Sequence, residues 1–280
     1  KNRRANSKTT ELSSIGGSVV ALLILLSLGL LITSSASAAQ ARIVAVGDIH
    51  GDFDAFVSIL QRARLIDGEY RWVGGNATLV QTGDFLDRGP KSRDVLDLMM
   101  TLEKQAKKGG GRVLVLLGNH EMMNMTGDLG YVTSEDYASF ADKHSEKRRK
   151  AAFKTYLKLR KRRARTMGQP PPIFTPETER AWMESHPLGF VEHREAFGPK
   201  GKYGGWLRQR PAVARLRDVV FLHGGISPAL GSWKVSDINK RLEQEVRTFD
   251  VIQRYLVKRQ LILPFFTLEE VTAAVRAEHE

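Results

Sequence analysis

The chain has 280 residues, of which 42% are hydrophobic and 26% are charged, a composition that excludes an intrinsically disordered chain. It contains no cysteine, which excludes disulfides and thiolate chemistry and leaves His, Asp, Glu or Asn to hold any metal. The net charge of +12 is uneven, because Lys143 to Arg165 contains 12 Lys/Arg and one Glu, a local net charge of +11.

Residues 1–40 have the pattern of an export signal. Basic residues at positions 1, 3, 4 and 8 precede the apolar run Val19–Ile32, and Ala36-Ser37-Ala38 then matches an A-x-A cleavage site. The run is short for a hydrocarbon core of ~30 Å, which needs roughly 20 residues. The sequence therefore predicts a protein that is exported, periplasmic or secreted. The alternative is an uncleaved membrane anchor formed by residues 19–32.

After Ala41, short apolar runs that predict strands alternate with segments of helical periodicity. The predicted strands are Arg42–Asp48, Ala77–Asp84, Arg112–Asn119 and Asp218–Gly225, and the predicted helices between the first three are Phe53–Ile66 and Ser92–Gly111. Ser92 is predicted to be a helix N-cap. This alternation predicts an α/β fold with a largely parallel core, in which ligands bind at the carboxyl ends of the strands.

A long interruption separates the third predicted strand from the fourth. The residues from Ser134 to about Ala164 have the pattern of a helix, and the proline-rich segment Gly168–Glu177 ends it. We interpret residues 134–185 as a basic helical cap inserted into a domain that spans residues 41–280.

Each predicted strand ends in polar residues that are flanked by glycine. A single histidine after a strand is usually a structural hydrogen-bonding group, but here four strands are expected to bring Asp, His and Asn to one edge. Without a counterion each such charge would cost several kcal/mol. A pair of divalent cations would supply the missing charge, and donors without sulfur suit Mn, Fe or Zn. The four segments are Gly47–Asp52 (GDIHGD), Gly83–Pro90 (GDFLDRGP), Gly118–Glu121 (GNHE) and His223–Gly225 (HGG).

These motifs resemble those of the calcineurin-like metallophosphoesterases, within the phosphoprotein phosphatase superfamily. The longer segments LLGNHEMMNMTGD, HPLGFVEHREAFGPKGKYGGWLR and FLHGGISP resemble the bacterial Shewanella-like phosphatase branch, and the resemblance extends from about Arg42 to Leu230. It implies a metallophosphoesterase-type βαβαβ core whose sheets are flanked by helices. It also implies a hydrolase that acts on phosphomonoesters, with phosphorylated proteins or peptides (Ser/Thr or Tyr) as substrates.

Carried over residue by residue, the resemblance implies two divalent metal ions. Asp48 and His50 would hold the first ion, Asn119 and His223 the second, and Asp84 would bridge both. A hydroxide shared by the two ions would then attack phosphorus in line.

The resemblance also implies roles for the residues around these ligands. His120 would be the general acid that protonates the leaving oxygen, with Asp87 keeping it charged. Arg88 would bind the phosphate oxygens through its bidentate fork, and Asn119 and His120 would also contact the substrate. The alternative is a salt-bridged loop without a ligand, in which Asp87 pairs with Arg88 or a nearby lysine.

Some residues depart from the family pattern or are expected to be structural. The family usually supplies another metal-binding histidine downstream, but only His279 follows His223, and we do not assign it. A second phosphate-binding arginine and a W-x-R-G-like segment are not found either, which would fit a truncated C-terminus or an under-coordinated second metal. Asp52 and Glu121 are expected to hold loops by hydrogen bonds.

The basic insertion has two interpretations. Lys147–Arg163 is either a solvated helix or a surface that attracts anionic partners such as acidic lipids or phosphosubstrates. Aromatic residues are sparse between its basic clusters, so no specific nucleic acid is predicted.

Two other functions remain open from the sequence. The segment DRGPKSRDVLDLM also resembles dinucleoside polyphosphate hydrolases of the diadenosine tetraphosphate type, although Glu121 stands where that family usually has Asp. The second is a non-catalytic, metal-containing module that binds anionic partners.

Overall fold

The computed structural model describes residues 41–276, and its contacts divide the chain into residues 1–41 and residues 42–280. The predicted leader concerns residues 1–40 and lies outside the described residues. No helix formed by residues 41–276 combines the length and the apolar character needed to cross a membrane.

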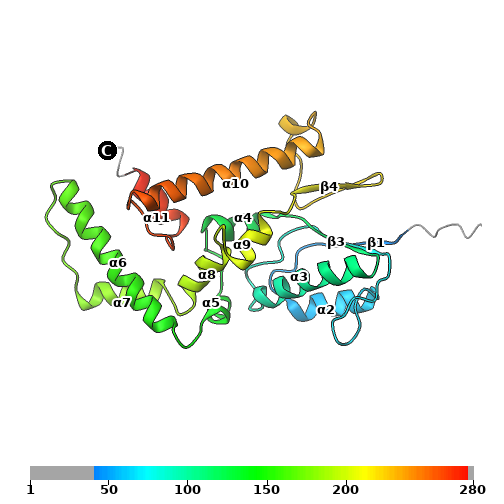
Figure 1. Ribbon diagram of the computed structural model, residues 1–280, viewed down its shortest axis with the longest axis horizontal. Coiled ribbons are helices and arrows are strands. Elements are labelled where there is room, and N and C mark those ends of the chain that lie inside the picture. Colours follow the sequence, from blue (N-terminus) through cyan, green and yellow to red (C-terminus); the bar gives the residue numbers. More distant parts are fainter. Residues whose placement is uncertain (1–40, 277–280) are drawn as a thin grey trace, which may run out of the picture. The chain divides into compact units, whose positions relative to one another are not determined.

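The second unit contains a three-stranded parallel sheet, and Figure 1 shows its strands β1 and β3 beside the helices α2 and α3. Its strands are β1 (Ile43–Val46), β2 (Thr78–Gln81) and β3 (Arg112–Val115), and they are connected by the helices α2 (Phe53–Arg62) and α3 (Ser92–Lys108). The strand order β1-β2-β3 with helical crossovers is the predicted βαβαβ core, so the α/β fold class is confirmed.

The sheet is apolar on both faces, because successive side chains of a strand point to opposite sides. Leu79 and Val113 belong to the main core, which also contains the buried side chains of α2 and α3. Val80 and Leu114 belong to a smaller cluster on the other face, which Phe221 joins. Burial on both faces explains why these strands have almost continuous apolar sequences.

The fourth predicted strand does not join the parallel sheet. The strand β5 (Val219–Leu222) pairs antiparallel with β4 (Val213–Leu216), and the two form a separate sheet. The prediction that Asp218–Gly225 belongs to the parallel core is therefore wrong, although a strand does form there. Ala214, Leu216 and Phe221 pack against Val80 and Leu114, which holds this hairpin beside the core.

Helices fill the interval between β3 and β4. The predicted continuous helix from Ser134 to about Ala164 is instead two helices, because a turn at Ala141–His144 separates them. In this turn the Asp142 carboxylate accepts a hydrogen bond from the His144 backbone at 2.7 Å. The helices are α4 (Asn119–Thr126), α5 (Ser134–Phe140), α6 (Ser145–Thr166), α7 (Pro176–Ser185), α8 (Phe190–Phe197) and α9 (Lys202–Leu207).

Ser92 is the first residue of α3 and not its N-cap, which is Lys91. The Ser92 hydroxyl group instead donates a hydrogen bond to Asp136 of α5 at 3.1 Å, so it joins α3 to the following segment. Gly109 ends α3, as the glycines at this position predict.

The last elements among the described residues are a 3-10 turn, η1 (Pro228–Leu230), and the helices α10 (Val235–Lys258) and α11 (Leu268–Arg276). These helices share a second apolar core with the segment between β3 and β4, in which Phe153 and Leu256 are both buried. Residues far apart in the sequence thus stabilise each other outside the parallel sheet. The interpretation of residues 134–185 as an inserted cap stays a prediction.

Candidate active site

The register of the parallel sheet brings the motif-bearing loops to one edge. Val46 lies opposite Gln81, and Gln81 lies opposite Val115, so β1, β2 and β3 end side by side. The backbone pairing continues past the strands, because the His50 backbone N–H donates to the Asp84 carbonyl oxygen at 3.1 Å. The first two loops are therefore fixed relative to each other before any side chain contributes.

A glycine is required where two of these loops approach closely. Gly83 has a φ of +107°, and a Cβ atom at this position would lie 2.6 Å from the backbone nitrogen of Gly118. A side chain at Gly118 would in turn collide with the Asp84 carboxylate. The glycines that flank the motifs let β2 and β3 deliver their polar residues side by side.

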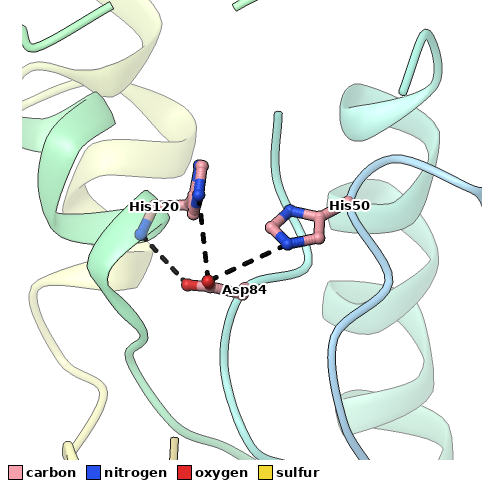
Figure 2. A group of neighbouring side chains, drawn as sticks. All are labelled: His50, Asp84 and His120. Carbon is pink, nitrogen blue, oxygen red and sulfur yellow. Dashed lines mark hydrogen bonds and ion pairs between the residues drawn. The ribbon is translucent and has the colours of Figure 1, made fainter. Parts of the chain in front are cut away.

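Asp84 lies at the centre of the site, with three imidazole rings directed at one of its oxygens. Its Oδ2 atom lies 4.0 Å from His50 Nε2, 3.9 Å from His120 Nε2 and 3.0 Å from His223 Nε2. Figure 2 shows His50 and His120 approaching this carboxylate from opposite sides. Asp84 is buried, so solvent screens its charge poorly.

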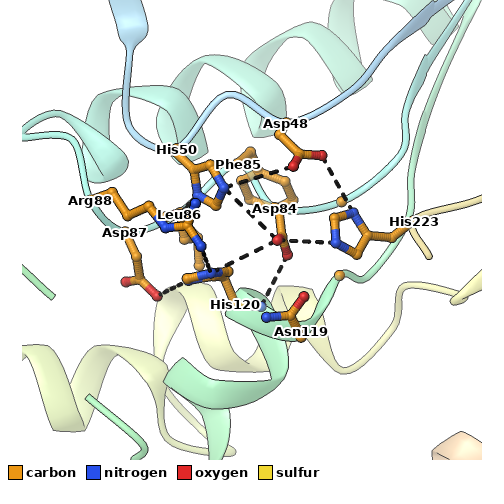
Figure 3. A network of polar contacts seen from close by, with 12 residues as sticks. Asp48, His50, Asp84, Phe85, Leu86, Asp87, Arg88, Asn119, His120 and His223 are labelled. Carbon is orange, nitrogen blue, oxygen red and sulfur yellow. Dashed lines mark hydrogen bonds and ion pairs between the residues drawn. The ribbon is translucent and has the colours of Figure 1, made fainter. Parts of the chain in front are cut away.

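Asp48 adds a second carboxylate to the same cluster. Its Oδ2 lies 3.8 Å from His50 Nε2, and its Oδ1 lies 3.6 Å from His223 Nδ1 (Figure 3). The ligand atoms form two groups of three, each within 4.8 Å of one another: His50, Asp84 and His120, and Asp48, Asp84 and His223. Asp84 belongs to both groups.

The donor set fits divalent cations. His223 Nδ1 is buried and has no hydrogen-bond partner, although a carboxylate lies nearby. His50 Nδ1 donates to the Leu86 carbonyl oxygen at 3.0 Å, which leaves the lone pair of Nε2 directed at Asp84 and Asp48. Such an orienting hydrogen bond is typical of metal-binding histidines, and imidazole with carboxylate suits Mn, Fe or Zn.

His120 is held by a buried acid. Its Nδ1 donates to Asp87 Oδ2 at 2.8 Å, and the Asn124 amide donates to the two oxygens of Asp87 at 2.8 and 3.0 Å. Burial raises the pKa of Asp87, while the hydrogen bonds from Asn124 and His120 oppose this rise. Asp87 thus bonds to His120 and Asn124 rather than to Arg88. The sequence analysis missed Asn124, which lies one helical turn after His120 on α4.

Arg88 is exposed and lies against the buried His120. Its Nη2 is 3.3 Å from His120 Nε2, and its guanidinium lies 5.4 Å from the centre of the Tyr131 ring. The Tyr131 ring is also 5.1 Å from the His120 ring, and its carbonyl oxygen accepts a hydrogen bond from the Arg88 backbone. Tyr131 lies in the loop between α4 and α5, where no sequence pattern indicates a role.

Asn119 lies beside the cluster without joining it. It is the first residue of α4, its side chain is exposed, and its amide lies 3.9 Å from Met123 Sδ. Figure 3 shows it next to Asp84 and His120. The structure therefore joins seven of the eight predicted site residues in one network of contacts and places Asn119 at its border.

Four residues of the site have backbone conformations that side chains rarely adopt. The φ angles are +49° at His50, +54° at Asp84, and +67° at both Asp87 and Arg88. A residue other than glycine with positive φ is uncommon and is concentrated at functional sites, where the surrounding contacts hold it in place.

Glu121 holds two of these loops together. Its carboxylate accepts hydrogen bonds from the backbone N–H groups of Asp84, Phe85 and Gly118 at 2.8, 3.0 and 2.8 Å. Burial raises the pKa of Glu121 to about 8. The expected loop-holding roles are confirmed, since Asp52 similarly accepts a backbone hydrogen bond in the first turn of α2.

Replacing Glu121 by alanine is expected to destabilise the protein strongly. Three buried N–H donors would lose their acceptor, and each unpaired donor costs roughly 1–3 kcal/mol. The free energy of unfolding, measured by urea denaturation, should fall by at least about 3 kcal/mol. Glu69→Ala is the matched control, because Glu69 is exposed and pairs only with Arg71 at the surface. Equal stability of the two variants would contradict this role.

The sequence model of the family described as calcineurin-like phosphoesterase matches residues 41–259. This chain belongs to the calcineurin-like phosphoesterase family. The family implies divalent metal ions, for which the His/Asp groups around Asp84 form a candidate site.

Known members of the family are similar to this chain over different lengths. "Shewanella-like protein phosphatase 1" of Plasmodium berghei is 25% identical over 221 residues, which cover 77% of this chain and 49% of the relative. "Shewanella-like protein phosphatase 2" of Arabidopsis thaliana is 42% identical over 99 residues, which cover 35% of this chain and 25% of the relative.

A solved structure of a phosphatase is also similar to this chain over part of its length. The crystal structure of a cold-active protein-tyrosine phosphatase of a psychrophilic Shewanella species matches with a TM-score of 0.50 and 27% identity, over 74% of this chain and 49% of that chain. The chain of this calcineurin-like phosphoesterase thus spans at most about half of the length of these relatives.

Proposed function

We propose that this chain is a metal-dependent phosphatase that hydrolyses phosphomonoesters on proteins. The observation that carries the proposal is the position of Asp84, which is shared by two His/Asp groups and lies next to the His120–Asp87 pair. Similarity to Shewanella-like protein phosphatases and to a protein-tyrosine phosphatase supports a phosphoprotein substrate.

In this proposal five side chains would hold two divalent cations, chosen from Mn, Fe or Zn. Asp48 and His50 would hold one cation, Asn119 and His223 would hold the other, and Asp84 would contribute to both. This assignment follows the family resemblance and differs from the two His/Asp groups of the structure, which combine His50 with His120 and Asp48 with His223. When bound, the cations supply positive charge for the phosphoryl group and activate the attacking water.

His120 then acts as the general acid. In the present geometry Arg88 Nη2 donates toward His120 Nε2, so the Nε2 atom accepts this hydrogen bond. A phosphoryl group would draw the Arg88 guanidinium onto its own oxygens, because bidentate pairing with an anion is stronger than a hydrogen bond to a neutral ring. His120 Nε2 could then carry the proton that the leaving oxygen needs. Asp87 stabilises the resulting imidazolium through its bond to Nδ1.

The proposal is tested with substrates from the competing classes. The purified chain, loaded with Mn²⁺, should hydrolyse phosphotyrosine and phosphoserine peptides at least about tenfold faster than diadenosine tetraphosphate, measured as kcat/KM. EDTA should abolish the activity. A preference for diadenosine tetraphosphate would favour the dinucleoside polyphosphate hydrolase. Metal binding without hydrolysis of either substrate would favour the non-catalytic module.

We further propose that the basic helix α6 attracts anionic substrates. Lys147, Lys154 and Lys158 are all exposed and recur at a spacing of seven and four residues, which places them on one face of α6. A continuous stripe of positive charge raises the local concentration of anionic partners.

Changing Lys147, Lys154 and Lys158 to glutamine together should lower kcat/KM for a phosphopeptide at low salt. The loss should shrink at high salt, because salt screens interactions between exposed charges beyond ~10 Å at 0.1 M. Initial rates at 20 and 500 mM NaCl test this, with Lys104, Lys107 and Lys108 of α3 changed to glutamine as the matched control. Equal losses at both salt concentrations would remove the proposal and leave α6 as a solvated helix.

We also propose that the chain is exported by residues 1–40. The order of basic, apolar and small residues supports this proposal. N-terminal sequencing of the mature protein distinguishes cleavage after Ala38 from a retained anchor at residues 19–32.

A further inference from the structure

Arg194, on α8, has a buried positive charge without an acidic partner. The residue is only 4% exposed. Its Nη1 donates to the Asn124 carbonyl oxygen at 2.8 Å, while its Nε is buried without a hydrogen-bond partner. Burial lowers the pKa of Arg194 to about 10. A guanidinium can donate five hydrogen bonds, so most of its capacity is unused here.

The acids near Arg194 are already engaged with other groups. The Glu270 carboxylate accepts a hydrogen bond from the Thr267 backbone at 2.8 Å, where it caps α11. The Asp250 carboxylate makes a two-fold pair with Arg208 at 2.8 and 2.9 Å. Among residues 41–276, no acid forms an ion pair with Arg194, although the charge of Glu270 partly offsets the charge of the guanidinium. A buried charge in this state costs several kcal/mol unless an anion reaches it.

Arg194 lines a cavity of about 810 Å³ between α6, α8, α10 and the segment before α11. A cavity of this size can enclose a drug-sized molecule. Most of its wall is apolar and comes from Met125, Ala152, Val191 and Phe265. The cavity thus combines a large apolar surface with one buried cation, Arg194, which has unused hydrogen-bond donors.

We propose that this cavity binds a small amphipathic carboxylate. The carboxylate would pair with the guanidinium of Arg194, and the hydrocarbon part would pack against the apolar wall. A carboxylate has one negative charge, which matches the single buried guanidinium, and its two oxygens fit the guanidinium fork. Three further cations line the cavity, but Arg148 is already paired with Asp142 and Glu192, and Lys200 and Arg254 are exposed. A dianion would therefore find only one buried cation, and desolvating its second charge would be costly.

The binding site lies outside the groups around Asp84, so it can be tested without reference to catalysis. Isothermal titration of the full chain with sodium decanoate, in EDTA to keep divalent cations away, should give one site per chain. The neutral analogue 1-decanol should bind at least about 30-fold more weakly, because losing one buried charge pair costs 2 kcal/mol or more.

Two variants test the two parts of the site. Thr155→Trp fills the cavity from α6, where Thr155 is an exposed lining residue, and should abolish decanoate binding without affecting folding. Arg194→Met should bind decanoate no better than 1-decanol. Arg160→Met is the matched control, because Arg160 is exposed, lies on α6 like Thr155 and does not line the cavity. This variant should keep the wild-type affinity for decanoate.

Equal affinity of the wild-type chain for decanoate and 1-decanol would overturn the proposal. Unchanged decanoate binding in Thr155→Trp would overturn it as well, and this result does not depend on whether Arg194→Met folds.

Discussion

Replacing His120 by asparagine is expected to lower kcat by about 10²- to 10⁴-fold, the usual contribution of a general acid. The asparagine cannot deliver a proton to the leaving oxygen, and Asp87 would lose the imidazolium that it stabilises. Bound metal per chain should stay the same if His120 acts as the acid, since the five proposed ligands remain in place; a loss of metal would instead assign His120 to the metal-holding group that it forms with His50 and Asp84. Circular dichroism and metal analysis establish that the variant is folded and loaded.

Substrates with different leaving groups distinguish a general acid from a residue that only stabilises the fold. The loss in His120→Asn should be smallest for p-nitrophenyl phosphate, whose leaving group needs little protonation, and largest for phenyl phosphate. His144→Asn is the matched control, because His144 is exposed and precedes α6 without a capping side-chain bond. Full turnover in His120→Asn, or equal losses for the two substrates, would contradict the assignment.

Replacing Asp84 by asparagine is expected to remove both metal binding and activity. The neutral amide has similar shape and can still accept the hydrogen bond from the His120 backbone, so the fold should persist. The variant lacks the charge that both His/Asp groups share. Removing a residue that only hydrogen-bonds to a metal ligand lowers metal affinity about 10- to 100-fold. Removing the shared ligand Asp84 should therefore lower metal affinity by more than ~100-fold.

Elemental analysis after dialysis, together with a phosphopeptide assay, checks this expectation. Asp218→Asn is the matched control, because Asp218 is fully exposed in the turn between β4 and β5. If Asp84→Asn retained the metal content of the control, the proposed centre would be wrong, whatever the activity. A retained thermal unfolding midpoint would show that the loss of metal is not a loss of fold.

The core of the fold could be predicted because its elements have strong local patterns. The strands β1, β2 and β3 are short apolar runs that are followed by glycine and a polar residue, and α2 and α3 lie between them. The pairing of β5 could not be predicted in this way. The composition of an apolar run such as Val219–Leu222 does not indicate whether it pairs parallel or antiparallel. Its partner β4 is short and contains Arg215, so it has only a weak strand pattern.

The site residues that belong to sequence motifs could be predicted. The residues that reach the site only through the folding of the chain could not. The histidines and aspartates of the glycine-flanked motifs do meet, since His50 and His223 lie 4.0 and 3.0 Å from the Asp84 carboxylate. Tyr131 contacts His120 only because of the path of a loop, which has no periodicity to indicate it. Asn124 had a signal in its four-residue distance from His120, since residues so spaced share one face of a helix.

The left-handed backbone at Arg88 has a consequence for evolution and for protein engineering. Glycine would adopt a φ of +67° without steric cost, whereas an arginine is held there against a penalty on the order of 1 kcal/mol or more. A glycine at this position would ease the local geometry and remove the guanidinium beside His120. Selection for thermal stability alone would therefore favour glycine at position 88 and lower the turnover. Selection for turnover would favour arginine.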